Sequence, residues 1–166
     1  MKKLIFVIAL FACYQIFAAV IYRGSSTSGS AAYNYSLSEK RLYRGSSTSG
    51  SAIFYYEAGN IPKIYRGSSS SGTTAYIFEY SGALIRMYHG SSTSGTISYI
   101  WEHGSTPKIY RGSSTSGSVA YTLEYYDSLV RIYRGNGTSG SPFAVIEKYD
   151  EIPKPMLMFI VILLGE

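Results

Sequence analysis

The sequence predicts an all-β protein built from six tandem β-hairpin repeats of about 22 residues. A Tyr-x-Gly marker recurs six times at spacings of 21 to 23 residues, and each marker opens a loop rich in Gly, Ser and Thr. Between the loops, apolar and polar residues alternate, which is the pattern of β-strands. A period in this range is typical of repeat proteins, in which no single unit buries its own apolar face.

The segment before the first repeat has the pattern of a secretory leader. Two lysines precede an apolar stretch over residues 4–12, and Ala18 and Ala19 offer small residues for cleavage. Residues 1–19 are therefore predicted to be a signal peptide that is removed on export. The protein is expected to be exported and to be periplasmic, outer-membrane-associated or extracellular.

The single cysteine leaves a second interpretation of this leader open. Residues 10–13, Leu-Phe-Ala-Cys, resemble the lipobox of bacterial lipoproteins, in which the cysteine becomes the lipidated first residue. Cys13 is therefore a candidate lipidation site, and acyl chains would attach the protein to a membrane. An uncleaved anchor is a third alternative. One cysteine also excludes an internal disulfide framework.

Each repeat unit is predicted to contain two strands that pair across a short turn. If Glu57 faces Lys63, then Tyr55 faces Tyr65, and opposite charges meet on one face. Glu102 and Lys108 match in the same way, whereas two other pairs, Glu79 with Arg86 and Glu124 with Arg131, are one residue further apart. That extra residue predicts a longer turn or a β-bulge in those two hairpins.

Two arrangements of the six hairpins are open. In an antiparallel meander, successive hairpins form one long, curled sheet of about 12 strands. In a β-solenoid, each unit is one coil and identical residues stack into ladders. The hairpin pairing and the drifting period favour the meander, with the six-repeat domain at 20–154 and an apolar C-terminal capping segment at 155–166. That segment is expected to be a buried strand or short helix over an open end of the core, or an apolar tail that contacts a membrane or partner.

The repeated Tyr and Arg of each marker are the candidate ligand-facing residues. A row of aromatic rings and guanidinium groups suits sugars or anionic polymers, because Tyr stacks on apolar faces and Arg forms bidentate contacts with carboxylates or phosphates. The alternative is that a repeat simply copies residues needed for cross-strand packing. The candidates are Tyr43, Arg44, Tyr65, Arg66, Tyr110, Arg111, Tyr133 and Arg134.

Nothing in the sequence predicts an enzyme. The glutamates recur once per unit, which fits structural pairing, and the glycine spacing matches neither a phosphate-binding loop nor a serine nucleophile elbow. His89 and His103 are the only histidines and match no metal-binding spacing, so no metal or other cofactor is expected. Without the leader, 13 basic and 10 acidic residues remain, too small an excess to predict nucleic-acid binding.

The marker also suggests two resemblances. Tyr-Arg-Gly at 43–45 followed by Gly50 resembles the opening of MORN repeats, which are β-hairpin units of similar length, and implies only a related architecture. The Gly-x-Ser-Thr-Ser-Gly loops resemble those of bacterial exported tandem-repeat proteins and imply no function.

The first functional hypothesis is a non-enzymatic binding or structural module of the cell envelope, whose partner is a polysaccharide or another envelope component. The second is a binder of carbohydrates or anionic polymers through the Tyr/Arg row, and the third is a self-assembling, curli-like β-protein.

Overall fold

The computed structural model describes residues 18–166, and most of the predicted signal peptide, with Cys13, lies outside them. These residues form twelve β-strands, a short 3-10 helix η1 (Tyr149–Glu151) and an α-helix α2 (Lys154–Gly165). The strands are β1 (Ala18–Arg23), β2 (Ala31–Ser36), β3 (Arg41–Arg44), β4 (Phe54–Glu57), β5 (Lys63–Arg66), β6 (Thr74–Ser81), β7 (Leu84–His89), β8 (Ile97–Glu102), β9 (Lys108–Arg111), β10 (Val119–Tyr126), β11 (Leu129–Arg134) and β12 (Ala144–Glu147).

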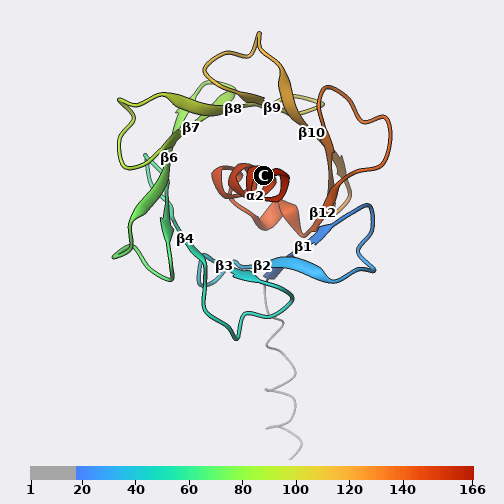
Figure 1. The fold of residues 1–166 in the computed structure, drawn as a ribbon, viewed down its shortest axis with the longest axis horizontal. Helices are drawn as coiled ribbons and strands as arrows, with labels where there is room; N and C mark the ends of the chain where they lie inside the picture. Colours follow the sequence, from blue (N-terminus) through green and yellow to red (C-terminus); the bar gives the residue numbers. More distant parts are fainter. Residues whose placement is uncertain (1–17) are drawn as a thin grey trace, which may run out of the picture.

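The strands close into a barrel instead of forming the open, curled sheet that was expected (Figure 1). Each strand pairs with its neighbours in the chain, and β1 pairs antiparallel with β12. The solenoid alternative is wrong, because every pairing in the ring is antiparallel and, apart from that of β1 with β12, joins consecutive strands. Five hairpins are continuous in sequence, and the sixth is made from the two ends of the barrel sequence. Closure therefore completes a six-unit ring and leaves no unpaired strand edge among β1–β12.

The register predicted by charge pairing is confirmed. Glu57 faces Lys63 and Tyr55 faces Tyr65 between β4 and β5, and Glu102 faces Lys108 between β8 and β9. Glu79 faces Arg86, but the longer turn or bulge expected beside this pair is wrong, because β6 and β7 close on the pair Ser81 and Leu84. Facing residues that are an odd number of positions apart enclose an even number of residues, and here the turn between Ser81 and Leu84 has two. Two-residue hairpin turns favour residues at positive φ. The first of them is Gly82, with φ 62°.

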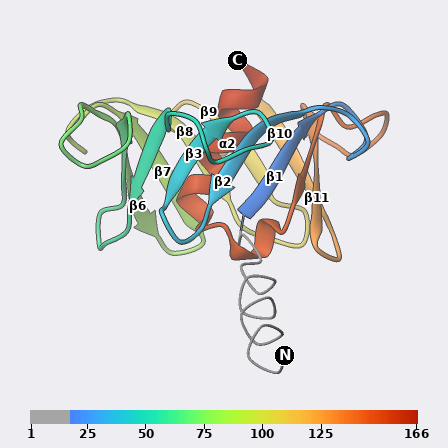
Figure 2. The same cartoon turned by 90° about the horizontal axis from the view of Figure 1, so that it is seen from below.

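Six loops project outward from the barrel (Figure 1) at one of its ends (Figure 2), and we call them the petal loops. They follow the odd-numbered strands at residues 24–30, 45–53, 67–73, 90–96, 112–118 and 135–143. All six begin with a glycine at positive φ, a conformation that other residues adopt only with strain. Its amide donates to a carbonyl at the start of the even-numbered strand of the same hairpin, as from Gly67 to Ile53 (2.9 Å) and from Gly24 to Phe143 (2.6 Å). The bond from Gly24 to Phe143 joins β1 to β12, so the hairpin made from the two ends of the barrel sequence has the same hydrogen bond as the other five.

The helix α2 runs along the inside of the barrel (Figures 1 and 2). Its sequence is apolar on every side, and nine of its residues are buried, because the strands surround it completely. Phe159 packs edge-on against Phe54, with ring centroids 4.7 Å apart. Gly165 lies against the ring of Tyr121 near the helix end, so a Cβ at this position would overlap that ring and force it to move. The segment 155–166 thus occupies the interior of the ring.

The boundary predicted for the leader falls within a strand. Ala18 and Ala19 begin β1, are buried, and pair with Ser36 and Tyr35 of β2. Cleavage after Ala19 would leave β1 beginning at Val20. Among residues 18–166, no helix is both long and apolar enough to cross a bilayer.

Candidate functional site

The repeated Tyr and Arg lie on opposite faces of the barrel wall. Neighbouring residues of a strand point to opposite sides, and in β5 the inward Ile64 belongs to the core inside the barrel. Tyr65 therefore faces outward and Arg66 inward. The candidate tyrosines Tyr43, Tyr65, Tyr110 and Tyr133 are all less than 9% exposed on the outer wall, whereas Arg44, Arg66, Arg111 and Arg134 are exposed. The sequence placed them in one row, and the structure separates them.

Five of the six marker tyrosines donate a hydrogen bond to the glutamate of their own hairpin. The hydroxyl of Tyr133 donates to Glu124 at 2.8 Å, and Tyr110 to Glu102 at 2.8 Å. Burial, followed by the bond to Glu124, raises the pKa of Tyr133, so the phenol stays protonated and donates. In the sixth unit, Tyr22 donates to Glu147 at 3.3 Å, across 125 residues of sequence. These Tyr–Glu hydrogen bonds therefore link paired strands on the outer wall.

Tyr133→Phe is expected to lower the free energy of unfolding by about 1 kcal/mol, because it removes one partly exposed bond to a carboxylate. Urea unfolding of the protein measures this. The control is Tyr126→Phe, whose side chain is 57% exposed and which we expect to change stability by less than about 0.5 kcal/mol. Equal effects of the two substitutions would contradict a structural role for the Tyr–Glu pair.

The arginines of the markers surround one mouth of the barrel. They are the last residues of β1, β3, β5, β9 and β11, and odd-numbered strands all run in the same direction in this antiparallel ring. We call that end the loop mouth, the opposite end the turn mouth, and the five residues the arginine collar. The sixth equivalent position, at the end of β7, is His89. The collar consists of Arg23, Arg44, Arg66, Arg111 and Arg134.

Part of the collar holds the end of α2. Arg23 donates to the carbonyl of Leu164 at 3.4 Å, and Arg134 donates to that of Gly165 at 3.2 Å. The last carbonyls of a helix have no partner within the helix and carry partial negative charge, which guanidinium groups stabilise. Arg44 and Arg66 have no side-chain hydrogen bond or ion pair within residues 18–166, so their donors face solvent.

Charge is distributed unevenly along the barrel axis. Five arginines and one glutamate, Glu166, lie at the loop mouth, and the petal loops contain no acidic residue, so the side chains of this end carry a formal charge of +4. Of residues 18–166, the other nine acidic residues lie in the turn-side half with eight basic ones, and several of these form ion pairs, such as Arg86 with Glu79 at 3.4 Å. Clustered charge of one sign attracts counter-ions and ligands of the other.

A hollow lies beside the collar. Its volume is about 250 Å³, and it is lined by Arg111, Arg134, Tyr121 and residues 118–120. The guanidinium of Arg111 lies 5.7 Å from the ring centre of Tyr99, and that of Arg134 lies 4.7 Å from the ring centre of Phe143. Tyr99 and Phe143 therefore position the guanidinium groups of Arg111 and Arg134 beside the hollow. An anionic group in the hollow would meet both positive charge and N–H donors.

The remaining expectations concern metals and catalysis. Within residues 18–166 there is no group of three His, Cys, Asp or Glu side chains placed to hold a metal ion.

The sequence analysis did not predict that the arginines form a ring apart from the tyrosines. Side chains alternate in direction along a strand, so each marker Arg points to the opposite face from the Tyr before it. That alternation was a usable signal.

The fold and the repeated pairs define a closed, sixfold β-repeat protein with an internal helix. The chain belongs to the 6-fold beta flower protein family, whose model matches residues 21–142. No curated protein and no solved structure matches the chain. The family supports the repeat, all-β architecture, while the resemblances to MORN repeats and to exported tandem-repeat proteins stay expectations.

Proposed function

We propose that this protein is an exported, non-enzymatic binding module of the bacterial cell envelope, and that its ligand is an anionic polysaccharide held by the arginine collar. The observation that carries the proposal is the side-chain charge of +4 at the loop mouth, where Arg44 and Arg66 have no acidic partner among residues 18–166. Exposed guanidinium groups bind carboxylates, sulfates and phosphates through paired donors.

A polysaccharide is favoured over other polyanions by the surroundings of the collar. The petal loops that flank it are rich in hydroxyl groups, and Ser47 and Ser49, for example, are hydrogen-bonded to each other at 2.7 Å, so their oxygens are held in place. Hydroxyl groups match the alternating donors and acceptors of sugars. The secretory pattern of the leader further supports an extracytoplasmic ligand.

Self-assembly of the curli type is less well supported. Assembly through strands needs an unpaired edge, and every strand of the closed ring is hydrogen-bonded on both sides. The collar offers the more direct basis for a function.

The test is binding of the exported protein to polygalacturonate, with neutral dextran and duplex DNA in parallel. Arg44→Gln combined with Arg66→Gln is expected to weaken polygalacturonate binding roughly tenfold, because two exposed ion pairs are lost. His89→Arg is expected to strengthen it roughly threefold by completing the sixth position. Binding should weaken as salt is raised, because these charges are exposed.

The matched control is Arg86→Gln combined with Arg131→Gln, which removes two arginines from the outer wall at the turn-side half of the barrel. Their partners, Glu79 and Glu124, lie at 3.4 and 3.7 Å. Equal weakening by both double variants would refute the collar as the site. Tighter binding of DNA than of polygalacturonate would refute the choice of ligand, and no binding of any polyanion would refute both.

A further inference from the structure

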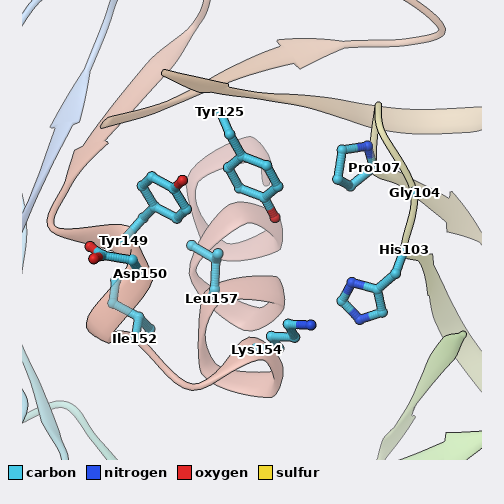
Figure 3. Close-up of a pocket in the computed structure, with 9 residues that line it drawn as sticks. All are labelled: His103, Gly104, Pro107, Tyr125, Tyr149, Asp150, Ile152, Lys154 and Leu157. Carbon is cyan, nitrogen blue, oxygen red and sulfur yellow. The ribbon is translucent and has the colours of Figure 1, made fainter. Parts of the chain in front are cut away.

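A second concave site lies at the turn mouth, at the opposite end of the barrel from the collar. Its volume is about 300 Å³, within the range of small-ligand sites, and its lining is mostly apolar. The floor is Leu157 of α2, and Pro107 forms one wall. Figure 3 shows three polar groups around the space above Leu157: the hydroxyl of Tyr125, the ring of His103 and the ammonium group of Lys154.

The aromatic wall of this site is already ordered. Tyr125 stacks on Tyr149 of η1 with ring centroids 4.7 Å apart and planes 13° apart. Tyr125 is nevertheless 39% exposed, so part of its surface is open to solvent. A ring fixed in this way loses little freedom when a flat or cyclic ligand packs against it, which lowers the cost of binding.

The charged groups of the site favour an anion. Lys154 has no ion-pair partner within residues 18–166, and in Figure 3 its side chain extends toward His103. Burial, followed by the charge of Lys154, lowers the pKa of His103, so the imidazole is neutral near pH 7 and one of its nitrogens can donate a hydrogen bond. The carboxylate of Asp150 lies beyond Tyr149 in this view, on the side away from His103.

We propose that the turn mouth binds a small carboxylate carried on a six-membered ring. The ring packs between Tyr125, Pro107 and Leu157, and the carboxylate binds Lys154 with a hydrogen bond from His103. The ring can come from an aromatic acid or from a sugar acid, since both present an apolar face and one negative charge. This proposal is independent of the collar, because the two sites lie at opposite mouths.

The chain contains its own reporter for this site. Trp101 is its only tryptophan, and its ring lies 4.7 Å from that of His103, centre to centre. Protonated histidine quenches a neighbouring indole, and a carboxylate beside His103 stabilises the protonated form. Tryptophan fluorescence and the pH titration of His103 by NMR therefore report a bound carboxylate directly.

The experiment titrates the exported protein with benzoate and with glucuronate, and with benzyl alcohol and glucose as their uncharged counterparts. Saturable binding with a dissociation constant of roughly 1 mM is expected for at least one carboxylate, given the ligand's size. Bound carboxylate should also raise the pKa of His103. Binding by benzoate alone would assign an aromatic acid, and binding by glucuronate alone would assign a sugar acid.

Lys154→Met is expected to weaken carboxylate binding roughly fivefold, because it removes the cation and keeps an extended side chain. The control is Lys63→Met, on the outer wall opposite Glu57, which should leave binding unchanged. No saturable change in either readout with either carboxylate would overturn the proposal, as would equal binding of the uncharged counterparts or equal binding by Lys154→Met. Polygalacturonate binding should be the same in both lysine variants, so failure here is distinguishable from failure at the collar.

Discussion

Phe159→Ala is expected to lower the free energy of unfolding by about 3–5 kcal/mol, which is the usual cost of removing a fully buried aromatic ring. Phe159 is 2% exposed and lies between strands and helix, with its ring centre 4.7 Å from that of Phe54 and 5.3 Å from that of Tyr76. A barrel wall of β-strands cannot collapse into the gap, because its radius is fixed by the closed hydrogen-bond ladder. Urea unfolding followed by circular dichroism measures the change.

The control for this prediction is Ile61→Ala, at a turn where the side chain is 53% exposed. We expect it to change stability by less than about 0.5 kcal/mol. If Phe159→Ala lowered the free energy of unfolding no more than Ile61→Ala does, α2 would not be packed inside the barrel.

The repeat and the strand register could be predicted from the sequence, because they depend on local patterns. The side-chain period of a strand is two residues, so one charge pair, Glu57 with Lys63, determines the partners of the whole hairpin, as the observed register shows. The error at Glu79 and Arg86 has a similarly local cause. The sequence separation was interpreted as added turn length, although an odd separation also permits the tighter two-residue turn that β6 and β7 adopt.

Closure of the ring could not be predicted in the same way. It depends on the twist and curvature accumulated over twelve strands and on the pairing of β1 with β12, more than 100 residues apart. The place of α2 depends on closure in turn. Its apolar residues indicate burial on all sides, but only a closed wall creates an interior that surrounds a helix.

The two mouths differ in how far the sequence revealed them. The arginines of the collar were identified by their repetition. That they lie on the opposite face of the barrel wall from the tyrosines follows only when the direction of each side chain along its strand is considered. The turn-mouth site combines residues from β10, the turn after β8, η1 and α2. His103 and Lys154 are 51 positions apart, and no repeat relates them. Asymmetric sites of this kind on a repeat scaffold come from the elements that break the repeat, here η1 and α2.

A disulfide between β1 and β12 is expected to stabilise the protein by up to roughly 4–5 kcal/mol, because it closes a loop of more than 100 residues in the unfolded chain. Tyr22 faces Val145, and Arg23 faces Ala144. Adjacent antiparallel pairs alternate between hydrogen-bonded and non-hydrogen-bonded geometry, so one of these two pairs has the closer spacing. Both double-cysteine variants are made with Cys13→Ser, and urea unfolding is compared with and without reductant.

The matched control joins cysteines at Tyr22 and Tyr88, two marker tyrosines on β1 and β7, which lie six strands apart around the ring. This pair should stay reduced under the same oxidation. Because the cross-link can form only where two strands are adjacent, it separates a closed ring from an open sheet, in which β1 and β12 are the two far edges. Failure of both β1–β12 pairs to form a disulfide, with the folded structure retained, would show that the ring is open and that its sixth hairpin does not exist.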